Sequence, residues 1–124
     1  MRIYIAGPIT NGGKINDLET REKLVKTAIW AALSLLTQGH SPFIPHLNHY
    51  FEAEIGTLGF RLSHEQYLKW DFGWLRQAEA VLRLPGKSDG ADQEVALAHT
   101  LGIPVYTHIE DIPEGDNGSS TCGA

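Results

Sequence analysis

The segment Leu84-Pro-Gly-Lys-Ser-Asp-Gly-Ala-Asp-Gln-Glu94 connects an apolar run to a helical pattern, and it decides the fold predicted for this chain. The run before it, residues 80–84, has the length and composition of a buried strand and ends at Pro85. The residues after it, 91–102, repeat apolar side chains with the period of an α-helix and end at Gly102. The predicted order is therefore strand, loop, helix.

Glu94 occupies an unusual place on this predicted helix. At about 100° per residue the apolar side chains gather on one face, with Glu94 in its middle. The apolar residues are Ala91, Val95, Leu97, Ala98 and Leu101. A carboxylate among buried positions needs a partner or a function, and Glu94 also follows a strand end, where open α/β sheets bind ligands. Two interpretations of Glu94 therefore stay open at this point. It is either a functional carboxylate or an acid at the start of a helix that only interacts favourably with the helix dipole.

Composition limits the classes of protein that the chain can represent. A length of 124 residues suits one domain. The net charge of −5 argues against binding of nucleic-acid polymers, because such proteins usually present a basic face. The one cysteine, Cys122, lies in a polar tail, so no internal disulfide is expected. No segment has the pattern of a signal peptide or a membrane span, and we expect a soluble cytoplasmic protein without a membrane partner.

The N-terminal region predicts a strand followed by a loop that can bind an anion. Residues 2–6 form a short β-rich run that stops at Gly7 and Pro8. The loop Ile9-Thr-Asn-Gly-Gly-Lys14 has glycines whose backbone N–H groups can turn toward an anion, with Thr10 and Lys14 as further donors. Its spacing matches neither the dinucleotide fingerprint nor the P-loop. A plain flexible turn is the alternative.

Helices and strands alternate along the rest of the chain. A long helix is expected from a capping box at Asn16 to about Gln38, then a short strand over residues 41–45 and an irregular stretch over 46–62. The buried stripe expected on the long helix comprises Leu18, Leu24, Val25, Ala28, Ala32, Leu35 and Leu36. Residues 102–107 form the last predicted strand. We therefore expect an α/β fold, a three-layer sandwich around a mainly parallel, Rossmann-like or flavodoxin-like sheet, as one domain over 1–112 with a flexible polar tail over 113–124.

A second carboxylate lies in the middle of an apolar helix face. The helix expected from Ser63 to Ala78 has Asp71 at the centre of a face whose other members are Tyr67, Leu68, Trp74, Leu75 and Ala78. Two such acids, on elements either side of one strand, indicate a shared cleft. The alternative is a structural pairing of one acid with Arg2, Arg83 or a buried tyrosine. His46 and His49 lack a nearby carboxylate or cysteine at ligand spacing, so we expect no metal and no other cofactor.

Three motifs follow one another in a recognisable order. They are Ile3-Tyr-Ile-Ala-Gly-Pro8, Asp71-x-x-Trp74-Leu75-x-x-Ala78-Glu79 and Ser88-x-Gly90-x-x-x-Glu94. Together they resemble the nucleoside 2-deoxyribosyltransferase-like superfamily, which includes the 2′-deoxynucleoside 5′-phosphate N-hydrolases. The resemblance covers roughly residues 2–107 and implies an enzyme acting on a small nucleotide or nucleoside.

The resemblance also implies roles for individual residues. Glu94 matches the nucleophile that attacks the anomeric carbon, and Tyr4 matches the tyrosine that holds it. Asp71 matches the acid associated with proton delivery to the departing base, and His46 matches a position beside that base. In the phosphohydrolase branch the first loop and a serine six residues before the nucleophile bind the 5′-phosphate. The substrate-binding residues implied here, besides His46, are Gly7, Ile9, Thr10, Asn11, Gly12, Gly13, Lys14, Ser88 and Gly90.

The favoured function is an N-glycosidase that hydrolyses the base–sugar bond of a (deoxy)ribonucleoside 5′-monophosphate through a Glu94 glycosyl-enzyme intermediate. Lys14 stands where phosphate-binding members often carry an arginine, and Asp89 lies near an aspartate that the transferases favour. The alternatives are a nucleoside 2-deoxyribosyltransferase, a nucleotide-binding or sensing module without turnover, and a phosphoribohydrolase of the cytokinin-activating type. The last has a Pro-Gly-Gly-x-Gly-Thr-x-x-Glu motif that residues 85–94 match only in part.

Large aromatic side chains predict a homodimer or a higher homo-oligomer. Trp70 and Phe72 lie at opposite edges of the buried face of the helix 63–78, so one contact with the sheet cannot easily cover both. The resemblance implies that neighbouring chains complete each other's sites. The alternative is that residues 46–62 fold over one edge and cover Trp70 within a single chain.

Overall fold

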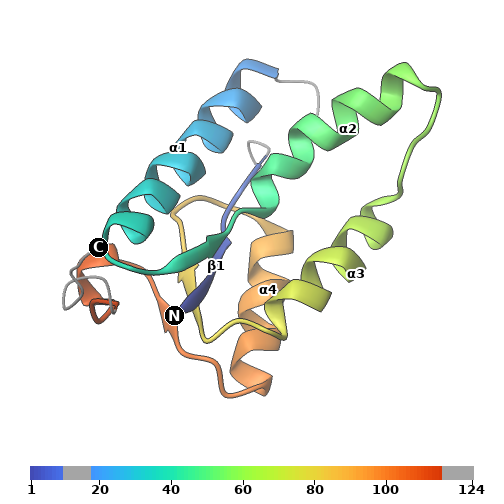
Figure 1. Cartoon of the computed structure of the whole chain (residues 1–124). Coiled ribbons are helices and arrows are strands. Elements are labelled where there is room, and N and C mark those ends of the chain that lie inside the picture. Colours follow the sequence, from blue (N-terminus) through green and yellow to red (C-terminus); the bar gives the residue numbers. More distant parts are fainter. Residues whose placement is uncertain (10–17, 116–124) are drawn as a thin grey trace.

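One all-parallel sheet of four strands forms the centre of the molecule (Figure 1). The computed structural model describes residues 1–9 and 18–115. The strand order is β2-β1-β3-β4, and the strands are β1 (Arg2–Ala6), β2 (Ser41–Phe43), β3 (Ala80–Arg83) and β4 (Val105–Tyr106). Tyr4 of β1 lies beside Phe43 of β2 and Val81 of β3. The predicted α/β fold with a parallel sheet is therefore confirmed.

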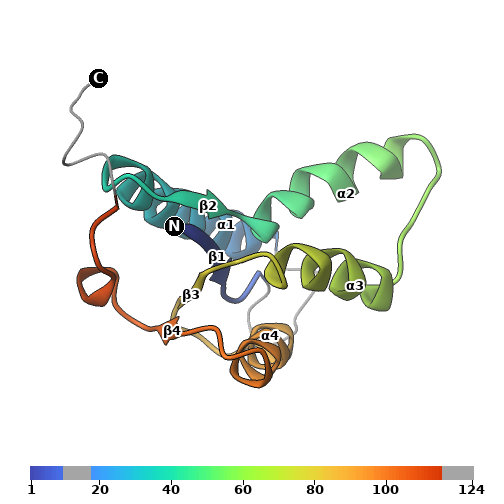
Figure 2. The same ribbon diagram turned by 60° about the horizontal axis from the view of Figure 1, so that its bottom comes forward.

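Helices cover both faces of this sheet, which gives the predicted three layers (Figure 2). Side chains alternate along β1, so Ile3 and Ile5 face α1 (Leu18–Thr37), whereas Tyr4 and Ala6 face the opposite layer. That layer contains α3 (His64–Leu75) and α4 (Asp89–Thr100). The core facing α1 comprises Ile3, Ile5, Ala28, Ala31, Ala32, Leu35, Ala80, Leu82 and Ile112. The core on the other face comprises Tyr4, Ala6, Leu75, Val81, Ala91 and Ala98.

Two leucines predicted in the buried stripe of α1 are exposed instead. Leu18 is 59% exposed and Leu36 is 55% exposed, while Ala31 is buried in their place. Leu18 and Leu36 are 18 residues apart, a whole number of helical turns, and therefore lie on the same side of the helix. That side is the edge of the stripe centred on Leu35 and Ala28. Leu101 was likewise predicted on the apolar face of the helix 91–102, but it is exposed at the C-terminal end of α4.

Residues 46–62 are mostly helical, so the predicted irregular stretch is wrong. Pro45–Leu47 forms a short 3₁₀ helix that leads into α2 (Asn48–Thr57). Gly56 lies in the last turn of α2, and Gly59 follows it with a φ of +83°, so both glycines belong to the helix end. The next helix, α3, begins after Ser63, whose Oγ accepts a hydrogen bond from Gln66 N at 3.1 Å in a full capping box. It ends at Leu75, before the predicted Ala78.

Helices α2 and α3 form an arm that extends past the carboxyl ends of the strands (Figures 1 and 2). The Phe51 ring on α2 meets the Trp70 ring on α3 edge to face, with 5.0 Å between centroids. At the base of the arm Trp74 stacks on Phe43 of β2, although it remains half exposed. Tyr67 and Leu68 are only partly buried, because they face a cavity beside the arm and not the core.

The chain after β4 returns to the end of α1. Residues Ile109–Asp111 form a 3₁₀ turn, and Ile112 enters the core below α1. His40 Nε2 bonds the Pro113 carbonyl oxygen at 2.8 Å, and Gly115 N donates to the Gln38 carbonyl oxygen at 2.7 Å. The described part of the predicted tail, residues 113–115, is thus hydrogen-bonded to the turn that follows α1. None of the helices in the described residues is long and apolar enough to cross a membrane.

Candidate active site

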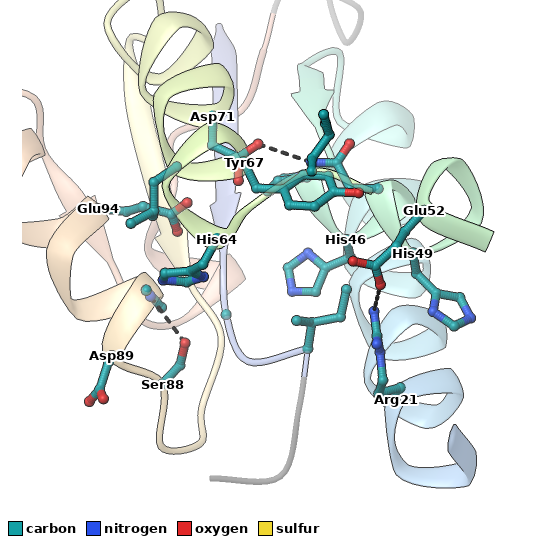
Figure 3. A pocket seen from close by; sticks show the side chains of 18 of the residues that line it. Arg21, His46, His49, Glu52, His64, Tyr67, Asp71, Ser88, Asp89 and Glu94 are labelled. Atoms are coloured by element: carbon teal, nitrogen blue, oxygen red, sulfur yellow. Dashed lines mark hydrogen bonds and ion pairs between the residues drawn. The ribbon is translucent and has the colours of Figure 1, made fainter. Parts of the chain in front are cut away.

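A cavity of about 720 Å³ lies at the carboxyl ends of β1, β2 and β3 (Figure 3). The chain leaves β1 through α1 toward β2, and leaves β3 through α4 toward β4, so the two connections diverge from neighbouring strands. This is the switch point at which open parallel sheets bind ligands. The walls come from the segment after β1, the 3₁₀ turn after β2, and helices α1 to α4. Its size is in the range of cavities that hold small molecules.

A buried hydrogen bond joins Glu94 to Tyr4 at the floor of this cavity. The Tyr4 hydroxyl donates to Glu94 Oε2 at 2.5 Å. Tyr4 is fully buried in the sheet, and Glu94 is only 6% exposed on the first half of α4. Burial, with the neighbouring Glu94 charge, raises the pKa of Tyr4, so its hydroxyl stays protonated and can only donate to the carboxylate. The tyrosine therefore fixes the position of one carboxylate oxygen.

Asp71 is the second carboxylate in the cavity and projects from α3. Its Oδ1 accepts a hydrogen bond from Asn48 Nδ2, on α2, at 3.2 Å. Burial raises the pKa of Asp71 to about 7, against the effect of that hydrogen bond. Burial also raises the pKa of Glu94 to about 8; the Tyr4 hydrogen bond opposes this rise, and the Asp71 charge adds to it. Near neutral pH the pair can therefore share one proton. Because Glu94 has the higher pKa, the form with Glu94 ionised and Asp71 protonated is the less populated of the two singly protonated forms.

A structural pairing of one acid with Arg2, Arg83 or a buried tyrosine was the alternative to a shared cleft. Of these pairings the structure shows only the one between Glu94 and Tyr4. Arg2 Nε donates to the Gln77 carbonyl oxygen at 2.7 Å. Arg83 bonds the carbonyl oxygens of Leu84 and Gly86 and pairs with Asp92 Oδ1 at 3.2 Å. Neither arginine is hydrogen-bonded to Asp71 or Glu94. Two carboxyl groups with raised pKa values, and with no cationic partner at bonding distance in the described part of the chain, are typical of functional sites.

His46 lies beside the chain as it leaves β1. Its ring is buried, and neither ring nitrogen has a hydrogen-bond partner among the described residues, although the Gly7 and Pro8 backbone is near. Burial lowers the pKa of His46 to about 4, so the ring is neutral around pH 7. A Cβ at position 7 would lie 2.9 Å from Leu84 Cβ and 3.4 Å from His46 Nε2. Because residue 7 has no side chain, the segments that follow β1, β2 and β3 can approach one another closely at this wall.

The start of α4 forms the wall on the other side of Glu94. Ser88 is the N-cap, and its Oγ accepts a hydrogen bond from Ala91 N at 3.0 Å. The Ser88 hydroxyl hydrogen is left to donate to a ligand. Gly90 and Lys87 line the cavity next to it. Positive helix-dipole charge, N–H groups and a lysine make this wall suited to an anion.

The structure brings most of the predicted site residues into one cavity. Among those that can be described, the cavity is lined by Gly7, Ile9, His46, Asp71, Ser88, Gly90 and Glu94, with Tyr4 behind Glu94. Thr10, Asn11, Gly12, Gly13 and Lys14 lie outside the described residues. His49 also lines the cavity, but the described residues contain no group of three side chains that could hold a metal ion.

Sequence reasoning missed the residues that the arm contributes. Asn48 and Glu52 were placed in an irregular stretch and therefore had no expected direction, whereas α2 turns both toward the cavity. Arg21 of α1, for which no prediction was made from the sequence, pairs with Glu52 at 3.1 Å. A helical reading of 48–57 puts Asn48 and Glu52 four residues apart on one face, which was the available signal.

Two comparisons with known proteins show what this chain is similar to. Among solved structures, a 2-deoxyribosyltransferase from the psychrotolerant bacterium Bacillus psychrosaccharolyticus is 26% identical, with a TM-score of 0.59 over 88% of this chain and 76% of that chain. The protein is thus a member of the nucleoside 2-deoxyribosyltransferase-like superfamily. Residues 1–107 match the family described as a domain of unknown function (DUF4406), and the chain belongs to that family. No curated protein matches it.

Proposed function

We propose that the protein is an N-glycosidase that hydrolyses the base–sugar bond of a deoxyribonucleoside or ribonucleoside 5′-monophosphate. The observation that carries the proposal is the pair of buried carboxyl groups, Glu94 held by Tyr4 and Asp71 held by Asn48, in one cavity at the strand ends. Similarity to a 2-deoxyribosyltransferase supports chemistry at the same bond.

The proposed reaction has two steps. The ionised Glu94 carboxylate attacks the anomeric carbon of the sugar, and the bond to the base breaks with its electron pair going to the base nitrogen. Asp71 in its acid form gives a proton to the departing base. Water then attacks the anomeric carbon, Asp71 takes a proton from that water, and Glu94 leaves as the carboxylate. Tyr4 holds one Glu94 oxygen, which leaves the other oxygen to react.

A panel of nucleosides and nucleoside monophosphates, with chromatography of the products, tests this function. We expect free base and sugar phosphate, without need of a second base. If product forms only when a second base is added, the protein is a transferase, the closest alternative. Binding without any product on the whole panel would support a sensing module.

We predict that the 5′-phosphate raises kcat/KM roughly 10- to 100-fold over the unphosphorylated nucleoside, because Ser88, Lys87 and the start of α4 present donors to an anion. Ser88→Asp keeps an N-cap for α4 but places a negative charge against the phosphate. The variant should therefore lose most of its activity on monophosphates and little on nucleosides. Steady-state kinetics on matched pairs of substrates measures both effects, and equal losses on the two would remove the phosphate from this wall.

We also predict a homodimer or higher oligomer that buries the aromatic side of the arm. Trp70 is 37% exposed and Trp74 is 53% exposed, with Phe51 and Phe60 exposed on the same arm. Phe51 of α2 contacts the Trp70 ring but leaves part of it exposed. Residues 46–62 therefore cover Trp70 only in part. Light scattering at micromolar concentration should give at least twice the chain mass, and Trp70→Glu should reduce it to a monomer. A wild-type monomer with full activity on dilution rules out this interface.

A further inference from the structure

The wall of the cavity opposite Glu94 carries a polar cluster made by three separate helices. Arg21 comes from α1, Glu52 from α2 and Tyr67 from α3 (Figure 3). Arg21 Nη2 pairs with Glu52 Oε1 at 3.1 Å. Glu52 and Arg21 both act electrostatically on the Tyr67 hydroxyl, which places that hydroxyl beside the ion pair. Figure 3 shows the Tyr67 ring between Asp71 and this pair.

Two hydrogen-bonding groups of this cluster are buried without a partner among the described residues. They are Arg21 Nε and the Tyr67 hydroxyl, which has Glu52 as a neighbour but no partner within hydrogen-bond distance in the described part of the chain. A buried donor without an acceptor destabilises the folded protein, so a ligand that accepts from both groups removes that penalty. Burial and the Glu52 charge raise the pKa of Tyr67, which therefore remains a donor. Glu52 supplies the opposite function: its carboxylate is half exposed and retains lone pairs that can accept hydrogen bonds.

The position of the cluster relative to the proposed chemistry defines what part of a substrate it meets. This step rests on the proposed function. With the anomeric carbon at Glu94 and the phosphate at Ser88, the base extends from Asp71 toward Tyr67 and the Arg21–Glu52 pair. The cluster then faces the edge of the base remote from the sugar. The cavity of about 720 Å³ has room for a two-ring base beyond the sugar phosphate.

We propose that Arg21, Glu52 and Tyr67 form a subsite that recognises the 6-oxopurine bases, guanine and hypoxanthine. The remote edge of these bases presents a carbonyl oxygen beside a ring N–H, and guanine adds an amino group. The carbonyl oxygen accepts from the Tyr67 hydroxyl and Arg21 Nε, and the N–H groups donate to Glu52. Adenine and cytosine both reverse these functions, because each presents an amino group beside a ring nitrogen that carries no hydrogen. A site built from such groups discriminates strongly, because the wrong base leaves them unpaired.

The test compares matched substrates on matched variants. Wild-type protein should hydrolyse the monophosphates of deoxyguanosine and deoxyinosine with kcat/KM roughly 10-fold or more above that of deoxyadenosine and deoxycytidine. Glu52→Gln and Tyr67→Phe should each lower the values for the two 6-oxopurines about 10-fold, and leave those for adenine and cytosine within about 2-fold. Glu54→Gln on the same helix and Tyr50→Phe, both at exposed positions, are the controls and should change none of the four.

Binding separates a failure of this subsite from a failure of the proposed function. Thermal shifts of wild type and the two variants with each monophosphate do not require turnover. Preferential binding of deoxyguanosine monophosphate that Glu52→Gln abolishes, without product, would keep the subsite and remove the glycosidase. Hydrolysis of all four monophosphates at similar rates, unaffected by both variants, would overturn the subsite alone. Equal losses of activity for all four bases would mean that the cluster stabilises the arm and does not recognise the base. Circular dichroism of the variants would then show a loss of helical structure.

Discussion

Glu94→Gln should keep the fold and reduce turnover by about 10²-fold or more. The amide is nearly isosteric and its oxygen can still accept the hydrogen bond from Tyr4, so the buried contact survives. It cannot attack the anomeric carbon as a carboxylate does. Single-turnover assays with a 5′-monophosphate measure the loss, and wild-type rates in the variant would remove Glu94 from the reaction.

The same substitution should stabilise the protein, and the pH dependence of that gain identifies its cause. The pKa of Glu94 rises from 4.5 to about 8 on burial, so the folded protein disfavours its charge. Below about pH 4.5 both folded and unfolded states carry the proton, and ionisation costs no stability. As pH rises toward about 8 the unfolded chain loses the proton first, and the free energy of unfolding falls. Glu94→Gln removes this cost.

Thermal unfolding at several pH values measures the effect. The melting temperature of Glu94→Gln should equal that of wild type near pH 4 and exceed it by roughly 5 °C or more at pH 9. Glu79→Gln is the control, because the pKa of the exposed Glu79 is lowered by the hydrogen bond from Arg2 N and its linkage has the opposite sign. A pH-independent gain for Glu94→Gln would mean that folding does not raise the pKa of the Glu94 carboxyl group.

Asp71→Asn should lower kcat/KM by about 10²-fold and change the shape of the pH profile. The reaction requires Glu94 ionised and Asp71 protonated, with pKa values of about 8 and about 7. Glu94, which must be ionised, has the higher pKa, so the active form is the minor singly protonated form. The wild-type profile should therefore be a narrow bell between these values, with limbs that belong to the coupled pair. Asparagine cannot lose a proton, so the descending limb should disappear.

Direct titration of Glu94 by carbon NMR separates the two neighbours that act on it. Asp71→Asn removes a like charge and should lower the pKa of Glu94. Tyr4→Phe removes the hydrogen bond that stabilises the ionised form and should raise it. Asp111→Asn, at an exposed position on the far side of the sheet, is the control. Shifts in the same direction for both variants would contradict the proposed arrangement.

The sequence allowed the sheet and the two carboxylates to be predicted, because each rests on a local pattern. Glu94 and Asp71 stand out as charges within apolar helix faces, and both are buried in one cavity. Arg21 and Glu52 could not be paired in this way, because they lie 31 residues apart in the chain and on two different helices. The helical spacing also wrongly predicted that Leu18 and Leu36 are buried. An apolar stripe in the sequence does not show how far the sheet extends beneath the edge of the helix.

The site is built from two parts of the molecule, which are the sheet with α4 and the arm of α2 and α3. Glu94 and Tyr4 are held by α4 and β1, whereas Glu52 and Tyr67 belong to the arm, which joins the sheet after β2 and before β3. Residues 49–68 can therefore be randomised as a library while the nucleophile, its tyrosine and the Asn48–Asp71 pair stay unchanged. Selection for release of a chosen base from such a library would turn one catalytic sheet into a set of glycosidases with different substrates.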